Sequence, residues 1–250
     1  MRILKKKKRV CFVHVPKCGG ESIKNALKKS YKPNLETISI RARSSYMGAN
    51  LEDGFELSFE GEEKLQSYRE GLMRYFLAHP KSGLLMGHYR GTKETLGLFK
   101  DDWLFATMLR NPVERFFSNY FFNRHKKSDH FKLDMSLEDF VETEQAISWG
   151  NIYVRFFSSN PKEYNSPIGI GEAKQTLQKY DAVGLLENLH QFSSDCSKLL
   201  DKKLRIGTQN RNPLKTNEKE MAISDEVRRK VETLCKPSMA VYEFAKKLND

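Results

Sequence analysis

The sequence predicts a single α/β domain whose central, mostly parallel sheet is covered by helices on both faces. Two observations favour this fold class. Short apolar runs rich in β-branched and aromatic residues alternate with longer amphipathic stretches, and no convincing linker or internal repeat divides the 250 residues. Strands buried on both faces, with helices between them, are typical of parallel sheets. We therefore expect one domain over residues 10–250, preceded by a solvated basic tail at residues 1–9.

Buried strands are predicted wherever a short apolar run is bounded by polar or turn-forming residues. These runs are Val10–Val15, Leu35–Ile40, Leu84–Gly87, Trp103–Leu109, Ala182–Leu186 and Leu204–Ile206.

Helices are predicted in the stretches between and after these strands, and their apolar residues recur at helical spacing. They are Glu21–Lys29, Glu62–Leu77, Val113–Arg124, Leu137–Glu144, Ile147–Phe157, Glu172–Lys179, Leu189–Leu200 and a stretch from about Asp225 to the end. The polar segment Arg41–Gly61 is longer than an ordinary connection, so we expect a flexible loop, a lid over the substrate, or disorder there.

The charge of the chain points to an anionic partner. Lys and Arg number 43 against 32 Asp and Glu, a formal net charge of +11. A nucleotide, a nucleic acid, an acidic glycan or an anionic membrane surface would each suit this balance. The aromatic residues near basic ones follow a core periodicity, which disfavours a nucleic-acid-binding module.

The cysteines and the N-terminal region favour a cytoplasmic, soluble protein. The four cysteines show neither the paired spacing of a zinc site nor the density of a disulfide scaffold, so we expect reduced thiols. The apolar run after the basic start ends at Pro16, which is too short for a signal peptide or a membrane span.

A first motif, "HVPKCGGESI", follows the first predicted strand and opens a helix, where open α/β sheets bind ligands. Gly19 and Gly20 allow backbone N–H groups to approach an anion, and the positive end of the helix points at it. Lys17 adds a full charge and Ser22 a hydroxyl. The alternative is an ordinary turn with a surface lysine.

Other phosphate-binding loops fit this motif less well. Because Lys17 precedes the glycines, the pattern GxxxxGK[ST] of nucleotide triphosphatases is absent, as is the dinucleotide fingerprint GxGxxG. A cysteine phosphatase would use Cys18 as its nucleophile, but Lys24 stands where that loop requires arginine.

A second motif, "LRNPVERFFSNYFF", begins at the end of the strand Trp103–Leu109. Asn111 and the proline after it suit the start of a helix. Asn111, Arg115 and Ser118 are spaced to form a polar stripe, with Arg110 just before it. We expect a second anion site beside the same edge of the sheet.

Together the two motifs resemble sulfotransferases that use 3′-phosphoadenosine 5′-phosphosulfate (PAPS), in particular the carbohydrate branch that includes heparan sulfate 2-O-sulfotransferases. With the weaker segments "GNIYVRFFSS" and "YDAVGLLENL", the resemblance spans about residues 10–189. It implies a P-loop-like sulfotransferase fold, PAPS as donor, adenosine 3′,5′-bisphosphate as product, and no metal.

The resemblance also assigns roles to residues that match the family's motifs. Lys17, Gly19, Gly20 and Ser22 would hold the 5′-phosphosulfate, and Arg110 and Ser118 the 3′-phosphate. Cys18 and Glu21 stand where family loops usually have threonine, so two hydroxyl donors are missing from the cofactor-binding loop. Lys17 would also stabilise the phosphate oxygen that leaves.

Sulfuryl transfer to an alcohol needs a group that accepts the hydroxyl proton. His88 follows the strand Leu84–Gly87 at the edge where the motifs converge, and its "GH" context is similar to that of the base in 2-O-sulfotransferases. An unperturbed histidine, with a pKa of about 6.5, suits this role. Glu21 and Glu94 are alternative bases, whereas His14 within a strand favours packing or bracing of the loop.

The sequence carries fewer signals for the residues that would bind the acceptor. Asn151 and Arg155 are one helical turn apart and are candidate substrate contacts, although Arg155 suits a structural role equally well. Arg211 and Lys215, in a basic polar segment, are candidate phosphate contacts, with a solvated loop as the alternative. The predicted partner is an acceptor glycan or another hydroxyl-bearing small molecule, not nucleic acid. A nucleotide-dependent phosphotransferase and a non-catalytic nucleotide- or nucleic-acid-binding protein remain the rival functions.

Overall fold

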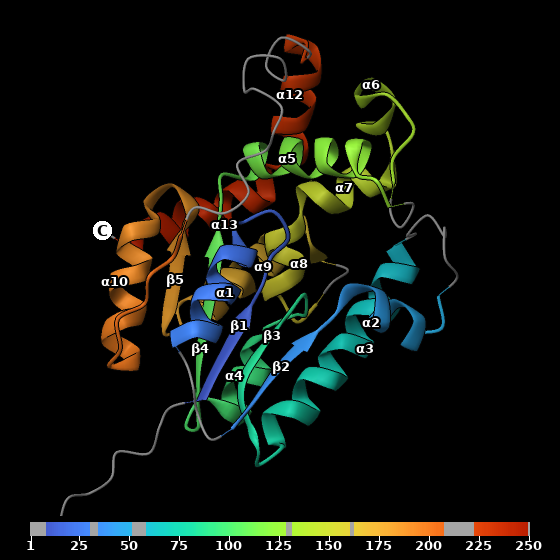
Figure 1. Cartoon of the computed structure of the whole chain (residues 1–250). Coiled ribbons are helices and arrows are strands. Elements are labelled where there is room, and N and C mark those ends of the chain that lie inside the picture. The colour runs from blue at the N-terminus through green and yellow to red at the C-terminus, as the bar shows by residue number, and fades with distance from the viewer. Residues whose placement is uncertain are drawn as a thin grey trace, which may run out of the picture.

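The computed structural model describes residues 9–30, 35–51, 59–128, 132–160, 163–207 and 223–249. In this part of the chain a parallel sheet is formed in the order β2-β3-β1-β4-β5 (Figure 1). Its strands are β1 (Arg9–Val13), β2 (Glu36–Ile40), β3 (Ser82–Gly87), β4 (Trp103–Leu109) and β5 (Ala182–Leu185). The predicted single α/β domain with a parallel central sheet is confirmed.

Helices surround this sheet and follow its strands along the chain. They are α1 (Gly20–Ser30), α2 (Ala42–Gly48), α3 (Phe59–Ala78), α4 (Lys93–Phe99), α5 (Pro112–His125), α6 (Leu137–Phe140), α7 (Glu144–Gly150), α8 (Ile152–Phe157), α9 (Pro167–Leu177), α10 (Leu189–Leu200), α12 (Asp225–Leu234) and α13 (Lys236–Lys247), with a 3-10 turn, η2 (Leu186–Asn188). Helix α4 was not predicted. No helix in the described part of the chain is long and apolar enough to cross a membrane.

The strand predicted at Leu204–Ile206 is wrong. Leu204 is buried, but its N–H donates to Ser197 Oγ (2.9 Å) and its carbonyl accepts from Ser193 Oγ (2.6 Å). Since two serines of α10 bind its backbone groups, Leu204 has none left for pairing with the sheet.

Two predicted helices are shorter than expected. The stretch Leu137–Glu144 contains α6 and only the first residue of α7, and Ile147–Phe157 is interrupted at Asn151, between α7 and α8. The interruption coincides with a close approach of two backbones, because a Cβ on Gly150 would overlap the carbonyl of Leu234.

The segment Arg41–Gly61 is not one loop in its described part. It contains α2 and the start of α3, while residues 52–58 lie outside the described residues. Tyr46 of α2 is buried against Leu65 of α3, and this contact anchors α2.

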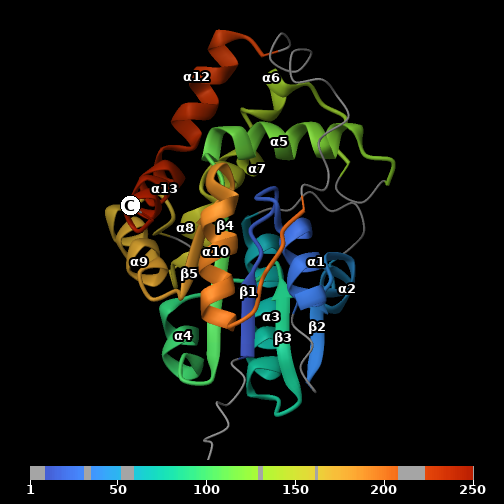
Figure 2. The same ribbon diagram turned by 60° about the vertical axis from the view of Figure 1, so that its left-hand side comes forward.

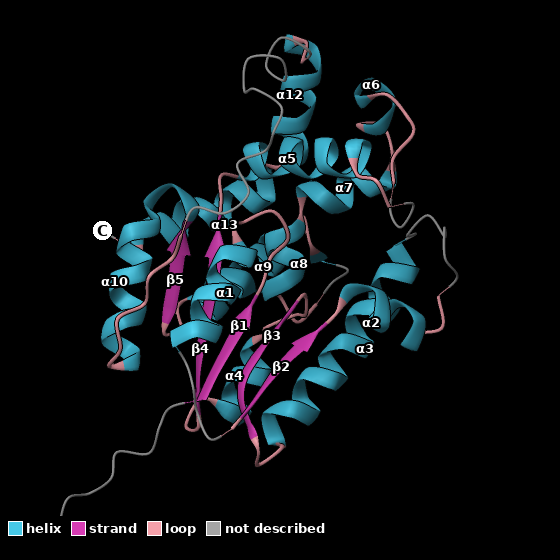
Figure 3. Cartoon of the chain, in the orientation of Figure 1, coloured by secondary structure: helices cyan, strands magenta, loops and turns pink. Residues whose placement is uncertain are grey.

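A group of helices lies beyond the carboxyl ends of the strands (Figures 2 and 3). We call α5, α6, α7 and α12 the cap. The cap has its own apolar cluster, which includes Phe116, Tyr120, Phe140 and Val231. Helix α5 starts as predicted, with Asn111 Oδ1 accepting from Val113 N (3.0 Å). The space between cap and sheet is where residues at the strand ends meet.

Candidate functional site

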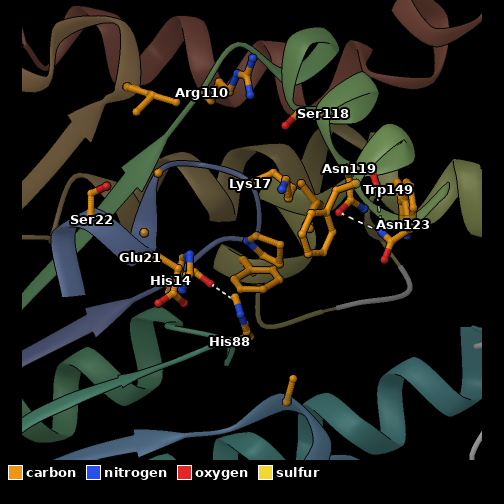
Figure 4. A pocket seen from close by; sticks show the side chains of 18 of the residues that line it. His14, Lys17, Glu21, Ser22, His88, Arg110, Ser118, Asn119, Asn123 and Trp149 are labelled. Carbon is orange, nitrogen blue, oxygen red and sulfur yellow. Dashed lines mark hydrogen bonds between the residues drawn. The ribbon is translucent and has the colours of Figure 1, made fainter. Parts of the chain in front are cut away.

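A pocket of about 1340 Å³ lies at the carboxyl edge of the sheet, under the cap (Figure 4). The strand register brings its walls together, because Val13 of β1 lies beside Gly87 of β3 and Thr107 of β4. The pocket is lined by residues of both predicted motifs and by the predicted base: Lys17, Gly19, Gly20, Glu21, Ser22, His88, Arg110 and Ser118. The expected convergence of the two motifs is therefore observed.

The loop after β1 depends on two glycines. Gly19 has a φ of +73°, in the left-handed region that favours glycine. A Cβ on Gly20 would overlap the imidazole ring of His14. Only a residue without a side chain fits at the start of α1 while His14 lies beneath it. His14 thus braces the loop, as its position within the strand suggested.

Lys17 is held over the pocket by two features. Its φ is +67°, an uncommon conformation for a residue with a Cβ. Its Nζ lies 3.8 Å from the centroid of the Phe122 ring, in a cation–π contact with α5. Phe122 is 51% exposed and lines the pocket, so the cap positions the lysine of the loop.

Cys18 does not bring its side chain to the pocket. The thiol is fully buried, 3.6 Å from the hydroxyl of Tyr153 and 3.7 Å from the carbonyl of Pro16. Burial raises the pKa of Cys18 to about 11. A neutral, enclosed thiol is not a nucleophile, so the structure argues against the cysteine phosphatase alternative and against a cofactor contact by this side chain.

Tyr153 connects the two motifs. Its hydroxyl donates to the carbonyl of Arg110, accepts from the N–H of Arg110 (2.9 Å) and contacts the thiol of Cys18. The sequence analysis singled out the segment that contains Tyr153 but not this residue. An aromatic residue in an apolar helix carries no signal of a partner more than a hundred positions away.

The second motif brings two of its four expected polar residues to the pocket. Arg110 and Ser118 line the pocket, and the guanidinium of Arg110 lies 3.9 Å from the carboxylate of Glu114. Arg115 instead points into the interior, where its Nη2 donates to the carbonyl of Trp149 (2.5 Å). The predicted polar stripe is therefore wrong for Arg115, which joins α5 to α7.

His88 has a defined protonation state. Its Nδ1 lies 2.7 Å from the carbonyl oxygen of His14. Because a carbonyl only accepts, Nδ1 carries the proton and Nε2 keeps its lone pair. The rings of His14 and His88 pack against each other with centroids 4.3 Å apart.

Burial sets the pKa values of this histidine pair. The pKa of His88 is lowered to about 4, chiefly by burial and then by the charges of Arg69 and Lys24, against the opposing effects of the hydrogen bond to His14 and the charge of Glu21. For His14, burial and then the neighbouring His88 hold the pKa well below its usual value. Both imidazoles are therefore neutral at pH 7.

The alternative bases are placed differently. Glu21 lines the pocket, but its carboxylate accepts from Lys24 Nζ (2.8 Å). Glu94 accepts from Ser159 Oγ and does not line the pocket.

The wall opposite the cap's α5 is built from α3 and α8. Arg155 lines the pocket, but its guanidinium pairs with Glu62 and, at 3.2 Å, with Glu63. Arg90 also pairs with Glu63. The structural role that the sequence allowed for Arg155 is thus observed, while Asn151 is turned away from the pocket and donates to the carbonyl of Ile147 (2.8 Å).

Several residues that line the pocket were not predicted from the sequence. Asn119, Asn123 and Trp149 belong to the cap, and Glu62 and Arg69 belong to α3. Asn119 and Asn123 are four residues apart on α5, the spacing of one helix face, and this signal was available in the sequence. The sequence carried no signal that Arg69 would line the pocket, because it lies in a helix rich in charged residues. Arg211 and Lys215 lie outside the described residues.

The described residues contain no group of three or more His, Cys, Asp or Glu side chains placed to hold a metal ion. A family model described as the sulfotransferase family matches residues 2–249 of the chain. No curated protein matches the chain. The family match spans nearly the whole chain, and the parallel α/β fold agrees with it, so this protein belongs to the sulfotransferase family, whose members transfer a sulfuryl group to an acceptor.

Proposed function

We propose that the protein transfers the sulfuryl group of PAPS to a hydroxyl group of a carbohydrate. The observation that carries this proposal is the presence of two anion-binding elements in one pocket. The glycine loop with the N-terminus of α1 lines one part, and Arg110 with Ser118 lines another. PAPS carries two separate phosphate groups, so this arrangement suits it better than AMP.

The residues of the pocket fit the donor. Lys17, Gly20 and Ser22 would bind the 5′-phosphosulfate together with the backbone N–H groups of the loop at the N-terminus of α1. Arg110 and Ser118 would bind the 3′-phosphate. The apolar side chains that line the pocket beyond the loop, available to a nucleobase, are Leu186, Leu189, Leu204 and Ile206.

The chemistry follows from the charges at the site. PAPS supplies the sulfuryl group and adenosine 3′,5′-bisphosphate departs. The neutral Nε2 of His88 accepts the proton of the acceptor hydroxyl, because Nδ1 is committed to the carbonyl of His14. Lys17 places its ammonium where negative charge develops on the leaving phosphate.

The acceptor side supports a sugar. Trp149 lines the pocket with an aromatic ring and Asn119 lines it with an amide. The amide of Asn123, beside them, donates to the carbonyl of Asn119 (3.0 Å) and accepts from Lys126 Nζ (2.9 Å). An aromatic face and fixed amides match the apolar face and the hydroxyl groups of a sugar ring. Glu21, which also lines the pocket, is a further proposed contact with the acceptor.

Thermal stabilisation tests the donor. We expect adenosine 3′,5′-bisphosphate to raise Tm more than ATP, AMP or a single-stranded oligonucleotide at equal concentration. Transfer of labelled sulfate from PAPS to a glycan panel then tests the reaction. Preference for ATP would favour a phosphotransferase, and preference for the oligonucleotide a nucleic-acid-binding protein; either result contradicts the proposal. Cytoplasmic location stays a prediction.

A further inference from the structure

Three arginines are buried in or beside the wall formed by α3 and α8. Arg69, Arg90 and Arg155 are each at most 6% exposed. Arg90 and Arg155 have carboxylate partners, supplied by Glu62 and Glu63 at the start of α3. Each of these two charges is therefore balanced within the protein.

Arg69 is different, because its hydrogen-bond partners are neutral. Its Nε donates to Ser45 Oγ (2.7 Å) and its Nη2 to the carbonyl of Ala42 (3.5 Å). Within the described part of the chain, Arg69 forms no ion pair. Burial lowers its pKa to about 10, and the more distant charge of Glu62 only partly offsets this. A desolvated cation without an ion-pair partner among the described residues is costly, which favours an external anion.

The position of Arg69 in the fold shows where that anion would lie. The side chain lines the same pocket as His88. The nucleotide motifs follow β1 and β4, His88 follows β3, and α3 packs on β3 and β2 at the far side of the sheet. Across the pocket the order is therefore donor loop, base and Arg69. An anion at Arg69 lies on the acceptor side of the base.

We propose that Arg69 determines acceptor specificity by binding an anionic group, a carboxylate or a sulfate ester, on the glycan that presents its hydroxyl to His88. The inference rests on the proposed function and names its acceptor class, an acidic glycan. A guanidinium suits this task because its planar N–H groups match the oxygens of carboxylates and sulfates. Nε and Nη2 of Arg69 already have partners, which fixes the orientation of the group.

Binding of this anion would also act on the base. The charge of Arg69 is one cause that lowers the pKa of His88, alongside Lys24, while Glu21 opposes it. An acceptor anion that neutralises Arg69 would remove that cause. The correct acceptor would thereby make His88 a stronger base.

Equilibrium binding of a matched set of oligosaccharides tests the proposal. The probes are a uronate-containing tetrasaccharide, the same tetrasaccharide after reduction of its carboxyl groups to alcohols, and the reduced form carrying sulfate esters. Each is titrated into wild-type protein with and without saturating adenosine 3′,5′-bisphosphate. We expect the wild type to bind at least one anionic probe about tenfold to a hundredfold more tightly than the neutral one. The anionic probe that binds identifies the group as carboxylate or sulfate.

Variants distinguish the effect of Arg69 on probe binding from the effect of the protein's net positive charge. Arg69→Gln should abolish the preference for anionic probes and leave the affinity for the bisphosphate within about twofold. Arg74→Gln is the matched control, because Arg74 lies on the same helix, is exposed and pairs with Glu70 (2.9 Å). It should keep the preference. If Arg69→Gln unfolds, Arg69→Lys, which keeps the charge but not the planar fork, should retain a reduced preference.

Three results would overturn the inference: equal binding of neutral and anionic probes by the wild type, binding of none of the probes, or equal loss of preference in Arg69→Gln and Arg74→Gln. Failure of the bisphosphate to bind would instead contradict the proposed donor. The titrations without nucleotide would still report on Arg69, so the two failures are distinguishable.

Discussion

The two sides of the pocket are built by different physical means. The donor side consists of backbone turns at the ends of β1 and β4, held by neutral contacts such as the hydroxyl of Tyr153 on Arg110 and Cys18. The opposite wall consists of α3 and α8, joined by buried ion pairs of Arg155 with Glu62 and Glu63. The first side is ordered by chain geometry, the second by charge pairing.

This difference predicts different responses to substitution. Changes on the donor side should alter nucleotide binding together with stability, because the same backbone serves both. Changes in the ion pairs should alter stability and leave nucleotide binding intact. Substitution of His88, between the two sides, should affect turnover and leave nucleotide binding intact.

The largest effect is expected from His88→Ala. Removal of the proposed general base should lower kcat by about a hundredfold to ten-thousandfold, while the affinity for adenosine 3′,5′-bisphosphate stays within about twofold. Steady-state transfer of labelled sulfate and calorimetric titration measure the two quantities. Full turnover in this variant would remove His88 from the mechanism.

The second-largest effect is expected from Glu62→Gln, which removes an ion pair from the wall formed by α3 and α8. It removes one carboxylate from the buried guanidinium of Arg155 and should lower the free energy of unfolding by about 3 kcal/mol. Denaturant unfolding measures this change, and affinity for the bisphosphate serves as control. A parallel loss of nucleotide affinity would show that the two sides are not independent.

Acidification should destabilise the histidine pair to a comparable degree. The folded pKa of His88 is about 4, below the unfolded value of about 6.5, so the folded state binds fewer protons between these values. Its contribution to stability is complete above pH 6.5 and is lost as pH falls through 4, on the order of 3 kcal/mol at most.

Denaturant unfolding from pH 7.5 to 4 measures this loss. His88→Gln, which does not titrate, should show a shallower decline. An equal decline in the variant would assign the pH dependence to other groups.

Gly20→Ala should disturb the loop after β1, because the added Cβ would overlap the His14 ring. We expect a loss of about 2 kcal/mol in unfolding free energy and weaker nucleotide binding. The double variant Gly20→Ala/His14→Ala should recover part of the stability, because the overlap disappears. Strictly additive losses in the double-mutant cycle would contradict the packing argument.

The smallest effect is expected from Tyr153→Phe. The change removes one hydroxyl and leaves the buried N–H of Arg110 without its partner, at a cost of about 1–2 kcal/mol. Because Arg110 is the residue that we propose binds the 3′-phosphate, the affinity for adenosine 3′,5′-bisphosphate should fall about tenfold and that for AMP less. Calorimetry with both nucleotides tests this, and an equal loss for both would limit Tyr153 to a structural role.

Local sequence pattern was enough to predict the strand-loop-helix structure of the two motifs. The strand, the glycine turn and the helix of the first motif lie within about twenty residues, and Asn111 with the following proline marks the start of α5. Short-range signals of this kind depend on backbone geometry that neighbouring residues impose. The same reasoning failed for Leu204, whose side chain is as apolar as predicted but whose backbone is bound by serines of α10.

The sequence by itself therefore determined the α/β class, the strand-to-helix units and the positions of both motifs. Only the tertiary structure decided which polar residues reach the pocket: Cys18 and Arg115 point into the interior, while Arg69 lines the site. The physical reason is that partners such as Glu62 and Arg155 are 93 positions apart, and no local periodicity records which charges meet after folding.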